Sequence, residues 1–387
     1  MDESLKKLLF DIICRSVWGR ELPDTQPLSD EQMQILYNIA KIHDLSHILT
    51  DGMMKTDIVP ESFKGELKKS LLLAVMRYEK QKYTLNEISE LFEQNEIPFI
   101  PLKGSVIRDY YPQPWMRTSG DIDVLVHKSD CEKAIKLIEE KLEYKLRQYE
   151  SLHAYSLYSP SGVQLELHYT LVEDVEILGT NEILNSIWNF VTDCDGKKYM
   201  KKMPNEVFML YHIVHIAKHF KGSGCGIRPF LDLWLLEQKM PFDRGRLDEM
   251  LNKSGILKFY DLSKQLCRVW FENDEHGEVT RHMEEFLLES GIHGNLVSRN
   301  TIRNAKGDSK IKAMMRLIFV PYEPLAKAYP GLKKRPYLYP FYQVGRWFKI
   351  FDRKKRRDMA NQSRGIMSVS SSKADAVSKM LEEFGLK

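Results

Sequence analysis

The chain has 387 residues, of which 43% are hydrophobic and 29% are charged, and its net charge is +3. This composition excludes an intrinsically disordered protein, and the length allows two or three domains. A charge this close to zero does not by itself indicate a nucleic-acid-binding protein, since such domains carry a much stronger local excess of Lys and Arg.

The cysteines and the N-terminus both indicate a cytoplasmic protein. The five cysteines are scattered and form no CxxC pair, which argues against a zinc site or a disulfide framework and fits a reducing compartment. The N-terminus lacks a basic segment followed by an apolar one, and no apolar run approaches the roughly 18 residues of a membrane span. We therefore expect no membrane span.

Residues 1–95 are expected to form an N-terminal helical region. Ser29, ahead of Asp30-Glu31-Gln32, is a typical N-cap residue, and apolar residues follow it at helical spacing from 36 to 42. A second, long amphipathic helix is predicted over 62–92. This region shows no catalytic constellation.

Residues 96–200 are expected to form a mixed α/β core. The segments IPFIPL (97–102) and DIDVLV (121–126) are predicted strands, and residues 130–142 are a predicted helix. A β-hairpin is predicted from 153–159 and 163–171, around the turn at 160–162. A small mixed sheet between helical regions indicates an α+β fold.

Residues 201–330 are expected to form a second helical domain. Helices are predicted over 206–220 and 228–238, and the Gly-rich break at 222–226 separates them. This break follows a helix and lacks a Gly-Lys-Ser/Thr ending, so a helix connection is favoured over a Walker A loop. Residues 331–387 form a basic, aromatic segment and a Ser-rich tail with a last short helix.

Three acidic residues form the most informative pattern. Asp121 and Asp123 alternate in a predicted strand, so their side chains share one face about 6–7 Å apart. Two carboxylates this close repel unless a cation lies between them, and such hard oxygen ligands suit Mg²⁺ or Mn²⁺. Glu166, between Leu165 and Leu167, would complete the site if its strand lies beside 121–126. Such a site can hold two ions for an in-line phosphoryl displacement.

Gly104 and Ser105 follow the 97–102 strand and supply a second feature. A Gly here lets the backbone approach a phosphate closely, and the next helix offers N–H donors and the positive end of its dipole. The Ser105 hydroxyl adds a donor. Lys103 and Arg117 flank this turn and could neutralise triphosphate oxygens, although both could also be ordinary surface cations.

The order of these features resembles the DNA polymerase β-like nucleotidyltransferase superfamily: Gly-Ser, Asp-x-Asp on a strand, then a third acid. The spacer 106–120 is longer than in compact members. More narrowly, LKG (102–104), Tyr111-Pro112 and RTSGDIDVLV (117–126) are similar to the uncharacterised bacterial nucleotidyltransferase family. The acid-x-His strand of that family matches Glu166-Leu167-His168. Its His-x-x-Lys-His helix, followed by an Arg and an Asp, matches His215, Lys218, His219, Arg228 and Asp232. The resemblance covers roughly residues 30–340.

This resemblance implies a metal-dependent nucleotidyltransferase that moves a nucleoside monophosphate from a nucleoside triphosphate to a hydroxyl acceptor and releases pyrophosphate. Asp121, Asp123 and Glu166 would be catalytic and would hold two Mg²⁺ or Mn²⁺ ions, and Glu166 could also take the acceptor proton. The nucleotide would be bound by Lys103, Gly104, Ser105, Arg117, Lys218, His219 and Arg228. Two alternatives keep this fold: a non-catalytic module that senses nucleotide or binds a partner, and an RNA-modifying enzyme.

Other residues have both a functional and a structural interpretation. His212, His215 and His219 share a helix face, but no HExxH motif and no neighbouring acid support a zinc site, and packing is the alternative to lining the cleft. Arg228 and Asp232 could form an intrahelical ion pair.

The basic and aromatic residues of 331–357 could bind single-stranded nucleic acid or an anionic membrane surface, or could be a solvated helix end packed on the core. Nucleic acid is therefore a candidate partner but not the favoured one.

Overall fold

A five-stranded mixed sheet organises the middle of the chain. The computed structural model describes residues 2–54, 56–147, 153–172, 179–291, 294–329, 331–348 and 353–386. The strands are β1 (Phe99–Pro101), β2 (Asp121–Val126), β3 (Lys145–Leu146), β4 (Ala154–Tyr158) and β5 (Gln164–His168), in the order β1-β2-β5-β4-β3. Only β2 and β5 are parallel; the other neighbours are antiparallel. The predicted α+β fold with a small mixed sheet is confirmed.

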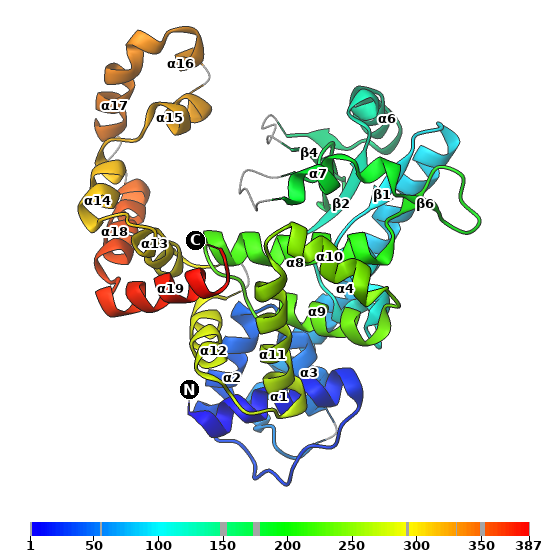
Figure 1. The fold of residues 1–387 in the computed structure, drawn as a ribbon, viewed down its shortest axis with the longest axis vertical. Helices are drawn as coiled ribbons and strands as arrows, with labels where there is room; N and C mark the ends of the chain where they lie inside the picture. The colour runs from blue at the N-terminus through cyan, green and yellow to red at the C-terminus, as the bar shows by residue number, and fades with distance from the viewer. Residues whose placement is uncertain are drawn as a thin grey trace.

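One face of this sheet is covered by helices α4 (Glu61–Gln94) and α6 (Cys131–Leu142), as Figure 1 shows. Ile122 and Val124 of β2 pack there with Phe92 of α4 and Ile138 of α6, all of them buried. Leu125 points the other way, into a second core. The period-two alternation of a strand therefore leaves Asp121 and Asp123 on the face away from α4 and α6.

The segment between β1 and β2 is made of short helices, and a small hairpin follows β5. The short helices are α5 (Gly104–Ile107), η1 (Arg108–Tyr110) and η2 (Pro114–Met116), and η3 (Lys128–Asp130) leads into α6. After β5 come α7 (Thr180–Asn185), η4 (Ile187–Asn189) and the paired strands β6 (Thr192–Asp193) and β7 (Lys201–Lys202).

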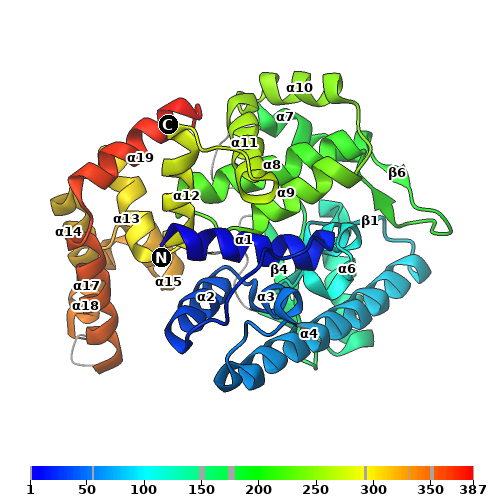
Figure 2. The same ribbon diagram turned by 90° about the horizontal axis from the view of Figure 1, so that it is seen from below.

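Two helical segments, far apart in sequence, share the second core. The N-terminal helices are α1 (Glu3–Trp18), α2 (Asp30–Ile42) and α3 (Ser46–Met53), and Ser29 caps α2 in a capping box with Gln32, as predicted. After the sheet come α8 (Asn205–Gly222), α9 (Arg228–Lys239), α10 (Arg244–Lys253), α11 (Leu257–Glu272) and α12 (Glu278–Ser290). Helix α1 packs against both α3 and α11 (Figure 2), so these segments stabilise each other.

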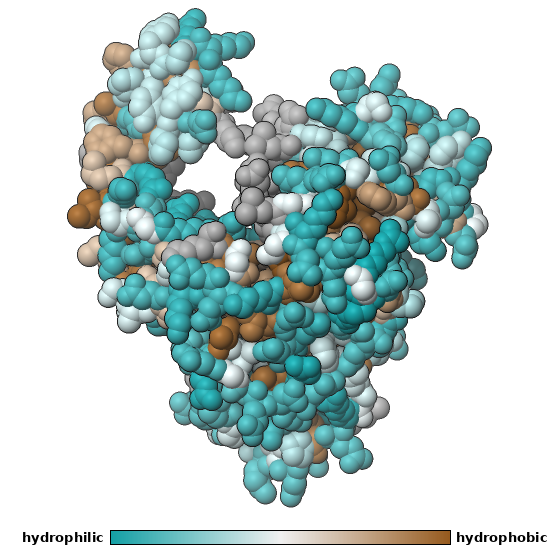
Figure 3. Space-filling model, in the orientation of Figure 1, coloured by the Kyte–Doolittle hydropathy of each residue, from teal (hydrophilic) through white to brown (hydrophobic). Residues whose placement is uncertain are grey.

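The C-terminal helices form an arm that stands away from the sheet in Figure 1. They are α13 (Leu296–Ala305), α14 (Lys310–Ile318), α15 (Tyr322–Ala328), α16 (Gly331–Lys334), η5 (Pro336–Leu338), α17 (Tyr339–Phe348), α18 (Arg353–Met367) and α19 (Ser371–Glu383). Helix α19 returns to α12 and α13, and the Phe384 ring after it packs on Phe220 and Phe259. Figure 3 shows hydrophobic residues along the outer edge where α14 and α17 lie. No helix within the described ranges has both the length and the apolar character to cross a bilayer.

The shared helical core predicts a large effect of a single truncation in α1. Leu9 is fully buried in this core, so Leu9→Ala should lower the free energy of unfolding by about 2–5 kcal/mol, measured by urea denaturation followed by circular dichroism. Leu72→Ala is the matched control, because Leu72 on α4 is 59% exposed and its truncation should change that free energy by no more than about 0.5 kcal/mol. Equal effects of the two substitutions would contradict the packing described.

Candidate functional site

The pairing of β2 with β5 brings the three acids to one face of the sheet. In the parallel register, Asp123 lies opposite Glu166 and Leu125 lies opposite His168. Residues opposite each other, or two apart in one strand, point to the same face. Asp121, Asp123, Glu166 and His168 therefore all lie on the face away from α4 and α6; spacing predicted this for the two aspartates, and for Glu166 it depended on the pairing of the two strands.

Asp123 is the most tightly held of these side chains. It is buried, and its Oδ1 lies 3.2 Å from Lys103 Nζ and 2.7 Å from His168 Nε2. Burial alone would raise the pKa of Asp123, but the charge of Lys103 and the hydrogen bond from His168 lower it well below its usual range. Asp123 is therefore a permanent carboxylate at neutral pH.

Asp121 and Glu166 are in the opposite electrostatic situation. Burial raises the pKa of Asp121, and the neighbouring Asp123 raises it further. The pKa of Glu166 is raised by burial and then by both aspartates. These shifts reflect carboxylates that repel one another in a partly desolvated place, and a bound cation would relieve that repulsion.

The donor set fits a divalent cation. Asp123, Glu166 and His168 each offer a ligand atom, and these atoms lie within 4.8 Å of one another. Carboxylate oxygens suit Mg²⁺ and Mn²⁺, and imidazole is tolerated by Mn²⁺ more readily than by Mg²⁺. Across the described part of the chain, this is the single group of three or more such side chains that meets this distance.

The turn before α5 places Lys103 beside Asp123. Lys103 has φ 44° and ψ −117°, a left-handed backbone conformation that non-glycine residues rarely adopt. Burial would lower the pKa of Lys103, but Asp123 raises it, so the ammonium stays charged. A strained residue that supplies a charged group to a cavity is typical of a functional site.

Gly104 is required for the close approach of this turn to the 117–120 loop. A Cβ at Gly104 would lie 3.3 Å from Ser119 Cβ, tighter than most side-chain contacts. The contact is fixed by Gln81 of α4, which donates to Ser119 O and accepts from the Ser119 hydroxyl, and by Arg108, which donates to Gly104 O. The turn at Gly104 and the 117–120 loop are therefore held in a fixed position relative to each other.

A cavity of about 310 Å³ lies over the acids. All of the candidate site residues predicted from the sequence line it except Ser105. Those that line it are Asp121, Asp123, Glu166, Lys103, Gly104, Arg117, Lys218, His219 and Arg228. The Ser105 backbone N–H donates to Leu102 O at 3.1 Å, so it is already used within the turn. The structure thus brings together residues from β2, β5, α5, α8 and α9.

Two ion pairs, one buried and one partly exposed, hold arginines that line the cavity. Arg117 Nε lies 2.8 Å from both carboxylate oxygens of Asp232, and the Tyr111 hydroxyl donates to the same carboxylate at 2.7 Å. Arg228 pairs with Asp44, which also accepts a 2.6 Å hydrogen bond from the Thr118 hydroxyl.

The intrahelical Arg228–Asp232 pair that their spacing allows is not among the ion pairs of the described residues, because each partner is engaged by another segment. These pairs join α9 to the 108–118 segment and to the end of α2.

His212 of α8 is buried, whereas His215 and His219 are partly exposed. His212 Nε2 lies 3.1 Å from Pro229 O, and the Nε2 atoms of His215 and His219 are 3.1 Å apart. Burial lowers the pKa of His212 to about 4 and, together with the charge of Lys103, that of His215 to about 3. His212 therefore holds the start of α9, while His215 and His219 line the cavity.

Three residues near the acids were not singled out as site residues from the sequence. His168 contacts Asp123, His153 lines the cavity and stacks on His168, and Asp44 pairs with Arg228. The position of His168 was detectable, since a residue two after Glu166 must share its face in a strand. His153 and Asp44 reach the site only through tertiary packing, for which the sequence carries no local signal.

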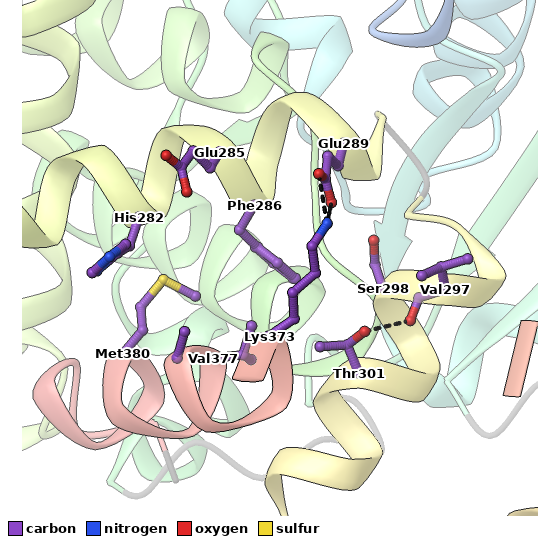
Figure 4. Close-up of a pocket in the computed structure, with 11 residues that line it drawn as sticks. His282, Glu285, Phe286, Glu289, Val297, Ser298, Thr301, Lys373, Val377 and Met380 are labelled. Atoms are coloured by element: carbon purple, nitrogen blue, oxygen red, sulfur yellow. Dashed lines mark hydrogen bonds and ion pairs between the residues drawn. The ribbon is translucent and has the colours of Figure 1, made fainter. Parts of the chain in front are cut away.

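A second, smaller cavity of about 90 Å³ lies between α12, α13 and α19 (Figure 4). Phe286, Val377 and Met380 give it an apolar floor, and at its rim Lys373 pairs with Glu289 at 2.8 Å. This cavity lacks the convergent acids and cations of the first one.

The comparison with protein families agrees with the sequence resemblance. A family model described as uncharacterised nucleotidyltransferase matches residues 29–272. A similar solved structure is that of the antibiotic-resistance factor ANT(2'')-Ia, with a TM-score of 0.34 and 10% sequence identity, over 49% of this chain and 97% of that chain. No curated protein matches the chain.

The buried Arg117–Asp232 pair predicts a large loss of stability when one partner is removed. Asp232→Asn leaves the buried Arg117 charge without its counter-ion, so it should lower the free energy of unfolding by about 3–5 kcal/mol in urea titrations. Glu278→Gln is the matched control. It breaks the exposed pair with Lys379 and should cost less than about 1 kcal/mol.

The same pair predicts a defined pH dependence. Burial would raise the pKa of Asp232, but Arg117 and His212 lower it below its usual range. A lowered folded-state pKa means that the stabilising contribution is complete above the unfolded value near 3.9 and is lost as pH falls toward the folded value. The difference in unfolding free energy between wild type and Asp232→Asn should therefore be largest at neutral pH and shrink below about pH 4. A difference that stays constant down to pH 2 would contradict this account.

Proposed function

The chain belongs to this family of uncharacterised nucleotidyltransferases, and on that premise we propose that it transfers a nucleoside monophosphate to a hydroxyl acceptor. The donor is a nucleoside triphosphate, and the reaction depends on a divalent metal. In it, the acceptor oxygen bonds to the α-phosphorus, the bond from that phosphorus to the bridging oxygen breaks, and pyrophosphate leaves. The proposal rests on one observation: Asp123, Glu166 and His168 each place a ligand atom within 4.8 Å of the other two. They do so on the sheet face that also holds Asp121.

The acidic residues would hold Mg²⁺ or Mn²⁺. Asp121, Asp123 and Glu166 would be the ligands, and His168 would orient Asp123 or join them. When bound, such ions neutralise charge on the triphosphate and lower the pKa of the attacking hydroxyl.

Glu166 is the best placed proton acceptor for the incoming hydroxyl. Its side chain is 25% exposed, whereas Asp123 is buried under Lys103 and His168. A carboxylate that is reachable from the cavity can accept the proton of the acceptor hydroxyl, as general-base catalysis requires.

The cations around the cavity would bind the triphosphate. Lys103 stays charged, and Gly104 leaves room for a phosphate to approach the backbone at the start of α5. Lys218 lines the same cavity, and burial together with Lys103 lowers its pKa to about 8, so bound phosphate would be needed to keep it fully charged. Arg117 and Arg228 would act mainly by holding the wall, since both are engaged by carboxylates.

Metal binding can be tested separately from turnover. Isothermal titration of the apo-protein with MnCl₂ should show binding that Glu166→Gln weakens by on the order of 10-fold or more. Asp193→Asn, an exposed acid on β6, is the matched control and should leave the affinity unchanged. The metal assignment would fail if both variants bound Mn²⁺ as the wild type does.

Turnover is tested by a pyrophosphate-release screen of the four nucleoside triphosphates with Mg²⁺ against pools of hydroxyl acceptors. Asp121→Asn or Asp123→Asn should abolish release while the circular dichroism spectrum stays that of the wild type. Release that survives either substitution would contradict the proposal. Tight Mg²⁺-dependent nucleotide binding without product over hours would instead identify a nucleotide sensor.

A further inference from the structure

The C-terminal arm exposes apolar side chains that its own packing leaves uncovered. On α14, Ile311, Met315 and Ile318 are exposed, and they are spaced four and three residues apart, along one side of the helix. On α17, Phe341 and Phe348 are 72% and 67% exposed, and Val344 lies between them. Each helix therefore carries one continuous apolar stripe that faces solvent.

The two helices are held together at their C-terminal ends. Arg346 donates to the carbonyls of Leu317 and Ile318, which are at the end of α14, and Trp347 Nε1 donates to Ile318 O at 2.9 Å. The rings of Phe319 and Trp347 are 5.3 Å apart. The two stripes therefore belong to one fixed unit, and Figure 3 shows hydrophobic residues along the edge that both helices form.

The sequence segment that contains these two helices is strongly basic, and Lys310, Lys312, Arg316 and Arg346 lie on the helices themselves. Residues 310–357 contain fourteen lysines or arginines and only two acidic residues, Glu323 and Asp352, in a chain whose total net charge is +3. The remaining sequence is therefore net negative. Apolar stripes beside a dense positive charge are complementary to a surface that is itself both anionic and apolar.

A cavity at the base of the arm would suit a phosphate group. It measures about 260 Å³ and is lined by arginines from three helices: Arg299 and Arg303 of α13, Arg316 of α14 and Arg346 of α17. Its described lining contains no acidic side chain. Arg346 Nε is buried without a hydrogen-bond partner among the described residues, and guanidinium groups bind phosphate well.

We propose that α14 and α17 dock on the surface of a membrane that contains anionic phospholipids. The apolar stripes enter the outer part of the acyl layer, and the arginine cavity binds the phosphate of an anionic headgroup. Single-stranded RNA fits less well, because it is held by aromatic stacking platforms, whereas the stripe of α14 is aliphatic and cannot stack on bases. A second copy of the chain fits less well because it would bring the same positive charge to the same face.

The test is co-sedimentation of the full chain with vesicles of phosphatidylcholine alone or with 30% phosphatidylglycerol. Binding should require the anionic lipid and weaken as NaCl rises, because salt screens the attraction of basic residues to the surface. The double variant Phe341→Ser with Phe348→Ser should lower the partition coefficient by on the order of 10-fold or more. Arg299→Gln with Arg303→Gln should lower it by on the order of 10- to 30-fold.

Leu72→Ser with Leu73→Ser is the matched control, because these apolar residues are also more than half or half exposed, on α4, and it should bind as the wild type does. Circular dichroism of each variant establishes that the fold is kept. The proposal is overturned by equal binding to neutral and anionic vesicles, or by no binding to either. It is also overturned if the double variant Phe341→Ser with Phe348→Ser instead loses binding to a single-stranded RNA oligonucleotide. The same holds if it loses a concentration-dependent dimer that light scattering detects in the wild type.

Discussion

The concentration of negative charge on one face of the β2–β5 pair is the constraint on which the rest of the site depends. Three carboxylates face the same cavity, and Asp123 is buried among them. Burying such a group is unfavourable without compensation, which here comes from Lys103 and His168 on one carboxylate oxygen. The strained backbone at Lys103 follows from the same need, because it directs the ammonium to Asp123. The negative charges of Asp121 and Glu166 are less well neutralised by neighbouring groups, so a bound cation would stabilise both carboxylates.

The wall of the cavity is held by a second set of charges, of which Asp232 and Arg117 are buried. Asp232 binds Arg117 and Tyr111, and Asp44 binds Arg228 and Thr118. These contacts tie α9, the 108–118 segment and the end of α2 into one frame. The shared core of the N-terminal and later helices supports that frame from behind. These ion pairs therefore help to set the distance between the sheet and helix α9, as a preorganised site requires.

The sequence predicted the positions of helices and strands well, but it predicted contacts between distant segments poorly. The alternation of DIDVLV was sufficient to place β2 at Asp121–Val126, and the Ser29 signal placed the start of α2. The position of Glu166 beside Asp123 was conditional on strand pairing, which no local pattern specifies. Arg117 and Arg228 have acidic partners 115 and 184 residues away, so their engagement in ion pairs was not predictable from spacing. Ser105 was expected to donate its hydroxyl to a phosphate; the structure shows that its backbone N–H donates to Leu102 O, and Ser105 is not among the residues that line the cavity.

A crystal structure of the protein soaked with Mn²⁺ and a non-hydrolysable nucleoside triphosphate would test the central claim most directly. The anomalous signal of Mn²⁺ should lie between Asp123 and Glu166, with Asp121 in contact and the triphosphate extending toward Lys103. An Mn²⁺ signal elsewhere, or a triphosphate bound away from this face of the sheet, would contradict the account.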